Sequence, residues 1–180
     1  MRVGVHLFLA SLALIGCTNG TEPVDVSDAI PANGERLRAN TLLASDGSRQ
    51  FLNWFDTVRG EDCSFGLASD GTTRCLPAAA PVSTTLFGPG GDCDRPIVVI
   101  PICQFPEEVP KYAAKPVGCG SALGPLILHV TEKLAPNELR EGTFGLGNCA
   151  AAQAPKGFDF YATGSSVPPT EFVQAVAVSD

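Results

Sequence analysis

The sequence of 180 residues contains few charged side chains, and the basic ones are scarcer than the acidic ones. Charged residues make up 17% of the chain, against about 25% in a typical soluble protein. So few charges among so many apolar residues exclude general disorder. The 12 Lys and Arg residues form no cluster, and 19 acidic residues bring the formal charge to −7. Because phosphate contacts need clustered cations, we expect no nucleic-acid partner.

Histidine is almost absent, which restricts the catalytic and metal chemistry open to the chain. The two histidines are His6 and His129, and His129 lies in the apolar run 126–130. A Ser-His-Asp hydrolase would depend on His129, and the sequence has no Gly-x-Ser-x-Gly motif. Structural zinc sites usually use CxxC pairs, and none is present. These absences favour a chain with no catalytic residue, no cofactor and no metal.

Helical periodicity is also missing. No segment of twelve or more residues shows a clear 3.6-residue period with caps, and one helical turn is expected within 133–140. Short apolar runs between Gly, Pro and Asp residues instead predict an all-β fold. We expect an antiparallel sandwich or small barrel built from short hairpins and stabilised by disulfides. The expected strands lie at 36–43, 49–58, 63–76 (a hairpin), 82–87, 97–102, 126–130, 138–144, 158–163 and 172–178, with 104–116 irregular.

The first feature that is present is an N-terminal leader. Arg2 precedes a mostly apolar run, 3–15, which is too short to cross a hydrocarbon core of about 30 Å as a helix. The run therefore predicts a signal peptide. It ends in Leu14-Ile15-Gly16-Cys17, which resembles the bacterial lipobox. In proteins with that motif the cysteine receives a diacylglyceryl thioether, so we expect Cys17 to be lipidated and to hold the chain on a membrane.

The composition divides the chain into three regions. Residues 1–16 are the expected lipoprotein signal peptide, 17–34 a polar, flexible tether, and 35–180 a single all-β domain. Removal of 1–16 takes away Arg2 and no acidic residue, so the formal charge changes from −7 to −8. Thr18 follows the lipidated cysteine, which favours the outer over the inner membrane. We therefore expect a lipid-anchored location in the cell envelope.

Six cysteines remain besides Cys17, and an even number in an exported protein favours disulfides. Six cysteines allow fifteen pairings, of which local geometry favours the sequential ones. Cys63 and Cys75 flank a hairpin centred on residue 69, which would place them opposite each other. A strand-like run separates Cys93 from Cys103, and Cys119 and Cys149 are then left. The predicted disulfides are Cys63–Cys75, Cys93–Cys103 and Cys119–Cys149.

Two hairpin turns repeat a short sequence. Leu43-Ala-Ser-Asp-Gly-Ser48 matches Leu67-Ala-Ser-Asp-Gly-Thr72 at an offset of 24 residues. Asp-Gly favours a tight hairpin turn because glycine tolerates positive φ. Two copies are too few to indicate a propeller or a solenoid.

Two parts of the sequence resemble a group of cysteine-bearing lipoproteins found in myxobacteria, a family without an established function. The resemblance covers residues 36–77, which include DGSRQFLNWFDTVRGEDCSFGLASDGTTRCLP, and residues 157–173, GFDFYATGSSVPPTEFV. The middle of the chain matches only in its cysteine spacing. The resemblance implies export, one disulfide-bonded β domain and a surface location. It transfers no active-site residue.

Trp54, Asp56 and Asp62 are the candidate ligand contacts. Asp56 and Asp62 could serve as the paired carboxyls of a glycosidase, and Trp54 could stack on a sugar. The competing interpretation makes Arg59 and Glu61 a loop ion pair and Asp62 a turn residue. Asp46, Asp70, Asp92 and Asp94 could ligate Ca²⁺, but the D-x-[DN]-x-[DN]-G pattern is absent and turn geometry explains the Asp-Gly pairs at Asp46 and Asp70.

The sequence therefore favours a bacterial envelope lipoprotein whose domain is a non-catalytic binding or structural module on the membrane surface. The membrane is the expected partner through the N-terminal lipid, with an envelope protein or a glycan as a further partner. The alternative is a secreted-type hydrolase acting on glycans, which would use the acidic residues near Asp56 and Asp62.

Overall fold

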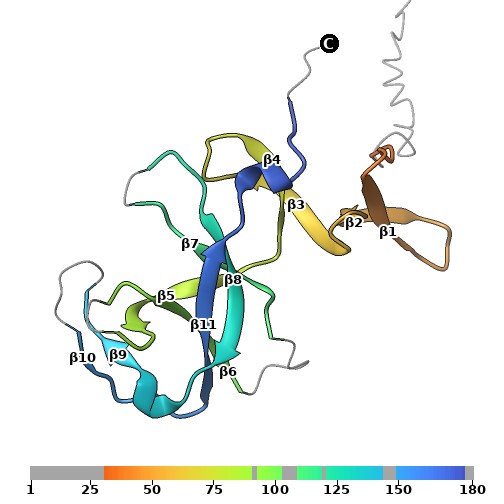
Figure 1. Ribbon diagram of the computed structural model, residues 1–180. Helices are drawn as coiled ribbons and strands as arrows, with labels where there is room; N and C mark the ends of the chain where they lie inside the picture. Colours follow the sequence, from red (N-terminus) through yellow and green to blue (C-terminus); the bar gives the residue numbers. More distant parts are fainter. Residues whose placement is uncertain (1–30, 91–92, 103–108, 119–120, 144–148, 177–180) are drawn as a thin grey trace, which may run out of the picture.

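The computed structural model describes residues 31–90, 93–102, 109–118, 121–143 and 149–176, and this part of the chain is almost entirely β (Figure 1). It contains two 3-10 helices, η2 (Pro136–Glu138) and η3 (Pro169–Glu171), and no α-helix among the described residues. The strands are β1 (Leu37–Leu43), β2 (Arg49–Asp56), β3 (Glu61–Leu67), β4 (Thr73–Pro77), β5 (Ala80–Phe87), β6 (Pro96–Pro101), β7 (Tyr112–Lys115), β8 (Leu126–Lys133), β9 (Arg140–Glu141), β10 (Ala150–Ala151) and β11 (Phe158–Ser166).

The strands form two sheets, which confirms the predicted all-β fold. Strands β1-β2-β3-β4 form an antiparallel sheet, named here the hairpin sheet. The second sheet has the order β10-β9-β5-β6-β11-β8-β7, and an additional pairing of β5 with β7 closes five of its strands into a barrel. That closing pair is parallel, with Ala80 opposite Ala113. The hairpin sheet and the barrel lie at different ends of the molecule in Figure 1.

The repeated turns have the same geometry, because their sequences supply the same groups. Ala44 N–H donates to the Ser48 carbonyl, and Ala68 N–H donates to the Thr72 carbonyl. The aspartate of each turn accepts hydrogen bonds from the amide and the hydroxyl of the residue two positions later. The following glycine has a positive φ, 88° at Gly47 and 77° at Gly71. Both turns therefore use aspartate for local hydrogen bonds and glycine for the left-handed position.

The disulfide Cys63–Cys75 is confirmed, with a Cα–Cα distance of 5.3 Å. The midpoint argument predicted that the two cysteines lie directly opposite each other, and this part of the prediction was wrong. The β3–β4 register pairs Cys63 with Pro77 and Phe65 with Cys75, so the bond is diagonal on one face. The hairpin is centred near residue 70 rather than 69, which shifts each cysteine by one position.

The other predicted disulfides were wrong for the cysteines that the structure describes. Cys93 is bonded to Cys149, 56 residues away, with a Cα–Cα distance of 5.4 Å. This bond excludes Cys93–Cys103 and Cys119–Cys149. Pairing β9 with both β5 and β10 brings the distant segments of Cys93 and Cys149 together, a contact that sequence spacing alone does not indicate. Cys17, Cys103 and Cys119 lie outside the described residues, as do the predicted signal peptide and Asp92.

Each face of the barrel wall has its own apolar cluster. Val98, Ala113 and Leu128 pack together with partly buried residues of β5 and β11, so all five barrel strands contribute to this interior cluster. The alternate residues Ile97 and Phe160 pack outside the wall against Leu134 and Leu139, which flank η2. This alternation is the period-2 pattern of strands that are buried on both faces.

Three segments differ from the strands that the sequence predicted. The predicted irregular segment 104–116 contains β7, which is only four residues long, lies between prolines and is needed to close the barrel. The predicted strand 138–144 is reduced to β9 after η2, which lies within the predicted helical turn. The predicted strand 172–178 is wrong for its described residues 172–176, among which Gln174 makes an isolated bridge with Arg74 of β4.

The C-terminal segment joins the two sheets. Cys75 N–H donates to the Val173 carbonyl and Ala175 N–H donates to the Thr73 carbonyl, so this segment lies beside β4. Phe172 packs with Tyr112 and Ile127 of the barrel strands. The loop before β8 contacts the hairpin sheet as well, and a Cβ at Gly124 would overlap the Leu67 carbonyl oxygen. The two sheets are thus held together by segments far apart in the sequence.

Candidate functional site

The candidate residues Trp54, Asp56 and Asp62 all lie in the hairpin sheet, but not on one face. The β2–β3 register pairs Trp54 with Cys63, Phe55 with Asp62, and Asp56 with Glu61. Paired residues share a face and neighbours along a strand alternate. Trp54 and Asp56 therefore lie on one face with Glu61, whereas Asp62 lies on the other.

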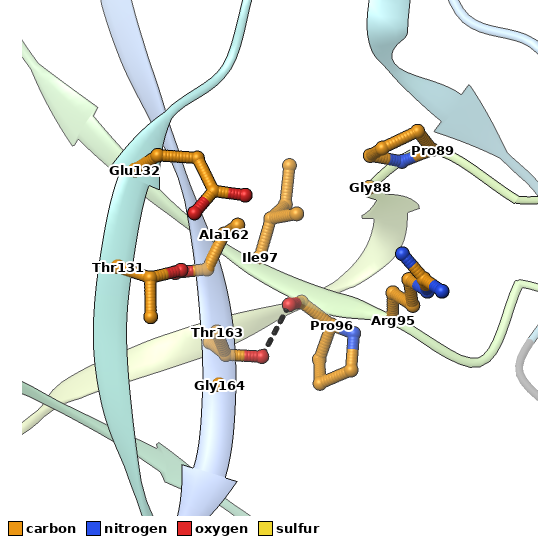
Figure 2. Close-up of a pocket in the computed structure, with 10 residues that line it drawn as sticks. All are labelled: Gly88, Pro89, Arg95, Pro96, Ile97, Thr131, Glu132, Ala162, Thr163 and Gly164. Carbon is orange, nitrogen blue, oxygen red and sulfur yellow. Dashed lines mark hydrogen bonds between the residues drawn. The ribbon is translucent and has the colours of Figure 1, made fainter.

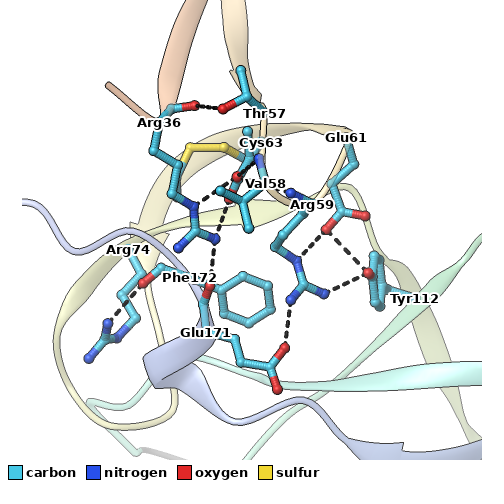
Figure 3. A network of polar contacts seen from close by, with 12 residues as sticks. Arg36, Thr57, Val58, Arg59, Glu61, Cys63, Arg74, Tyr112, Glu171 and Phe172 are labelled. Atoms are coloured by element: carbon cyan, nitrogen blue, oxygen red, sulfur yellow. Dashed lines mark hydrogen bonds and ion pairs between the residues drawn. A yellow bond between two sulfur atoms is a disulfide. The ribbon is translucent and has the colours of Figure 1, made fainter. Parts of the chain in front are cut away.

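Asp56 is buried, with 1% of its surface exposed, and its carboxylate is fully engaged by Arg36 (labelled in Figure 3) and by two backbone amides. Arg36 Nε donates to Oδ1 at 2.8 Å and Arg36 Nη2 donates to Oδ2 at 2.6 Å. The amides of Val58 and Arg59 donate to Oδ1 as well. Burial by itself raises the pKa of Asp56, but the bonds from Arg36 and these amides outweigh it and leave the pKa below its ordinary value. Asp56 therefore closes the β2–β3 turn and fixes the start of β1.

Glu61, on the same face, belongs to a second set of contacts centred on Arg59. Arg59 lies in the β2–β3 turn and donates to the carboxylates of Glu61 and Glu171, both at 2.6 Å, and to the Tyr112 hydroxyl at 2.7 Å. Its guanidinium carbon lies 4.8 Å from the centre of the Phe172 ring. Lys111 contacts the other oxygen of Glu61 at 2.6 Å. These five residues, Arg59, Glu61, Lys111, Tyr112 and Glu171, are named here the Arg59 network.

The contacts of the Arg59 network favour the charged forms of Arg59 and Glu61. Burial lowers the pKa of Arg59, but the hydrogen bonds to Glu61, Tyr112 and Glu171 outweigh it and raise the pKa above its ordinary value. Burial likewise raises the pKa of Glu61, and the bonds from Lys111, Arg59 and Tyr112 lower it further than burial raises it. The competing interpretation of Arg59 and Glu61 as an ion pair is thus confirmed, and the pair also connects the hairpin sheet to β7 and η3.

Asp62 lies on the opposite, exposed face of the hairpin sheet, and its interpretation as a turn residue was wrong, because it is the second residue of β3. Its Oδ1 accepts a hydrogen bond from the Asn40 side-chain amide at 2.9 Å, and the same amide donates to Asn53. These three side chains come from three adjacent strands. A cleft with paired carboxyls would need Asp56 and Asp62 on the same side of the sheet, and the register places them on opposite sides.

Trp54 lies in a row of aromatic residues on its face. The ring centroids of Phe51 and Trp54 are 5.4 Å apart and those of Trp54 and Phe65 are 6.1 Å apart, both in edge-to-face geometry. A bulge, seen as the register shift after Asn40, brings Phe51 onto this face opposite Thr41. Leu43 and Leu67 lie two residues beyond Thr41 and Phe65 along their strands, near the tips of the β1–β2 and β3–β4 hairpins, which point away from each other in Figure 1.

The row of Phe51, Trp54 and Phe65 is named here the apolar face, and the exposed Leu43 and Leu67 lie farther along their two hairpins. Leu43 is 63% exposed, Leu67 42% and Phe65 41%, while Phe51 and Trp54 are half-buried. At the other end of the same face, Leu37, Cys63 and Cys75 are covered by Val173. Sequence reasoning found only Trp54 of this set. The signal that could have found two more is the turn repeat, because Leu43 and Leu67 occupy its equivalent positions.

A pocket of about 270 Å³ lies on the outside of the barrel, between β6, β8, β11 and the loop after β5 (Figure 2). The Thr131 and Thr163 hydroxyls that line it donate to the carbonyls of Ala162 and Pro96. Arg95 and Glu132 extend along opposite walls in Figure 2. Much of its lining is glycine, proline and threonine, unlike the apolar and aromatic lining of most small-molecule sites.

The last candidate residue is His129. His129 of β8 is half-buried and lies opposite Tyr112, with ring centroids 5.5 Å apart. Among the described residues, no group of three or more His, Cys, Asp or Glu side chains could hold a metal ion. In the same part of the chain, no helix is long and apolar enough to cross a membrane.

Comparison with known proteins adds no relative. No family model, no curated protein and no solved structure matches the chain.

Proposed function

We propose that this chain is a lipid-anchored, non-catalytic binding or structural module of a bacterial cell envelope, on the outer rather than the inner membrane. The lipobox-like Leu14-Ile15-Gly16-Cys17 supports the anchor, and Thr18 after it supports the outer membrane. The resemblance of residues 36–77 and 157–173 to myxobacterial lipoproteins supports the same conclusion. The Cys63–Cys75 and Cys93–Cys149 disulfides suit an oxidising compartment outside the cytosol.

The observation that carries the non-catalytic part of the proposal is the engagement of Asp56 and Glu61. Both carboxylates are bound by cations and by further hydrogen-bond donors, and both keep a lowered pKa. A general acid needs the opposite, a raised pKa and access to substrate. The hydrolase alternative would therefore have to release Asp56 from Arg36 and from the amides of the β2–β3 turn.

The binding part of the proposal rests on the apolar face. The three aromatic rings are in contact and Phe65 is 41% exposed, and contiguous exposed apolar side chains are a feature of interaction surfaces. The face lies on the hairpin sheet, the part of the domain that directly follows the tether.

The anchor is tested by replacing its cysteine. We expect Cys17→Ala to abolish palmitate labelling in cells and to move the protein from the membrane to the soluble fraction. Thr18→Ala is the matched control, because it changes the adjacent residue and leaves the acylated sulfur in place. Equal membrane association of the Cys17→Ala and wild-type chains would contradict the anchor.

The non-catalytic part is tested separately with purified protein and envelope glycans. We expect no release of soluble fragments. Glycan cleavage that disappears in an Asp62→Asn variant of unchanged stability would favour the hydrolase alternative instead.

A further inference from the structure

We propose that the pocket on the outside of the barrel binds a small zwitterion, of the size of a dipeptide, through Arg95 and Glu132. The carboxylate of the ligand pairs with Arg95, and its ammonium group pairs with Glu132. The inference goes beyond the proposed function, because the pocket lies on the barrel whereas the apolar face lies on the hairpin sheet. Binding at this pocket requires neither the lipid anchor nor a catalytic residue.

The pocket lies where the pairing of β8 with β11 is irregular. Two residues of β8, Thr131 and Glu132, lie opposite a single residue of β11, Ala162. A second register shift places two residues of β11, one of them Gly164, opposite His129. The pocket is lined by Thr131, Glu132, Ala162 and Gly164. Because a bulge bends its strand and changes the direction of its side chains, the irregular pairing shapes the pocket and directs Glu132 along its wall (Figure 2).

Two opposite charges line the pocket and are free to bind a ligand. Arg95 and Glu132 are exposed, and neither side chain makes a hydrogen bond or an ion pair within the described part of the chain. Arg59 and Arg74, by contrast, each bind a carboxylate of the protein. A ligand with charge of one sign would be attracted by one wall of the pocket and repelled by the other. A zwitterion satisfies both walls.

The groups between the two charges suit a short ligand with small side chains. Ile97 of β6 and Ala162 of β11 are partners in the register and supply aliphatic groups to the pocket. The hydroxyl protons of Thr131 and Thr163 are donated to the carbonyls of Ala162 and Pro96. This leaves the two hydroxyl oxygens as acceptors for an N–H group of the ligand. A dipeptide of alanine offers both methyl groups and a backbone amide.

The size and lining of the pocket favour a dipeptide over a sugar or a larger molecule. Its volume of about 270 Å³ lies just below the range of about 300–1,000 Å³ that is typical of small-molecule sites. An extended dipeptide is roughly 7 Å long, at about 3.3–3.6 Å per residue. None of the described residues that line the pocket is aromatic, so a sugar ring would have no stacking surface. A neutral sugar would also use neither charge.

Isothermal titration calorimetry of the full-length protein with L-alanyl-L-alanine tests the site. We expect saturable binding with a Kd of about 1 mM or tighter. Two probes of nearly the same shape separate the two charges. In N-isobutyryl-L-alanine a methyl group replaces the ammonium group, and in L-alanyl-L-alaninamide an amide replaces the carboxylate. Each probe should bind about fivefold or more weakly than the dipeptide, because each lacks one charged hydrogen-bonding group.

Two variants assign each charge of the ligand to one wall. Glu132→Gln should lose the preference for the ammonium group and keep the preference for the carboxylate, and Arg95→Gln should show the reverse. A general loss of structure would not remove one preference and keep the other. The matched controls are Glu35→Gln and Arg38→Gln, which change exposed residues outside the pocket and should keep both preferences. Near-ultraviolet circular dichroism checks that each variant is folded.

Each outcome has one interpretation. Absence of saturable binding, or equal affinity of the wild-type protein for the three probes, overturns the inference. Retention of both preferences by Arg95→Gln and Glu132→Gln also overturns it, because the ligand would then bind elsewhere, as does an equal loss of preference in the control variants. These results leave the lipid anchor untouched, since Cys17→Ala tests it separately.

Discussion

At the scale of single residues, Asp56 shows how a candidate site residue becomes a structural one. An aspartate at the end of an aromatic strand is compatible with a sugar-binding or acid-base role. The tertiary structure surrounds it with Arg36 and two backbone amides, so its charge is compensated within the protein. A buried carboxylate with these partners stabilises the fold only while it is ionised.

The lowered pKa of Asp56 predicts a specific acid sensitivity. Its folded pKa lies below the unfolded value of about 3.9, so its contribution is fully present above roughly pH 4 and is lost as the pH falls through the folded pKa. Glu61 acts in the same direction. We expect Asp56→Asn to lower the free energy of unfolding by about 2–3 kcal/mol at pH 7. We also expect the free energy of unfolding of this variant to fall less steeply than that of the wild type as the pH decreases below about 4. Chemical denaturation between pH 2 and 7 measures both.

Asp62→Asn is the control for this prediction. Asp62 is exposed on the other face, and its replacement should change the free energy of unfolding by less than about 0.5 kcal/mol. An Asp56→Asn variant whose free energy of unfolding falls with decreasing pH as steeply as that of the wild type would contradict the structural role of Asp56.

At the scale of elements, the two hairpins show which local features were predictable. The Asp-Gly turns, the β3–β4 hairpin and the Cys63–Cys75 disulfide depend on residues within about a dozen positions of one another. Sequence spacing is informative over that range. Cys93 and Cys149 meet only because β9 joins both β5 and β10, and no local pattern records that pairing.

The two disulfides should differ in their effect on stability. In the chain-entropy treatment, closing a loop of 56 residues contributes about 4 kcal/mol, against about 3 kcal/mol for the 12-residue separation of Cys63 and Cys75. We therefore expect replacement of Cys93 and Cys149 by alanine to destabilise the protein more than replacement of Cys63 and Cys75. Denaturant unfolding of the two double variants measures the difference.

Peptide mapping without reduction checks the pairing itself. A peptide containing Cys93 should be linked to one containing Cys149. Recovery of a Cys93–Cys103 link would refute the connectivity.

At the scale of the whole molecule, the Arg59 network holds the hairpin sheet against the barrel. One guanidinium in the β2–β3 turn contacts β3, β7 and η3, and stacks on Phe172. The backbone bonds of the C-terminal segment to β4 lie beside it. The orientation of the apolar face relative to the barrel therefore depends on a few contacts among distant segments.

Removing Arg59 should loosen this connection. We expect Arg59→Met to lower the free energy of unfolding by about 2–4 kcal/mol, because Glu61 loses a charged partner in a poorly exposed position. Hydrogen exchange should accelerate at β3 and β7 more than at β6 and β11. Lys111→Met is the control: Lys111 is exposed, so its loss should cost less than about 1 kcal/mol. Equal effects of the two substitutions would argue against the central role of Arg59.

The sequence by itself determined the all-β class, the repeated turns, the disulfide within one hairpin and the ion pair of Arg59 with Glu61. Each of these depends on residues close in the chain, through the alternation of apolar and polar residues, through turn chemistry or through neighbouring charges. Only the tertiary structure decided that β7 closes the barrel, that Cys93 bonds Cys149, and that Asp56 and Asp62 lie on opposite faces. It also decided that Phe51, Trp54 and Phe65 form one row, since a bulge in β2 reverses the alternation and two hairpins must meet at Trp54. Register and long-range packing fix these features, and both arise from the balance of contacts over the whole chain.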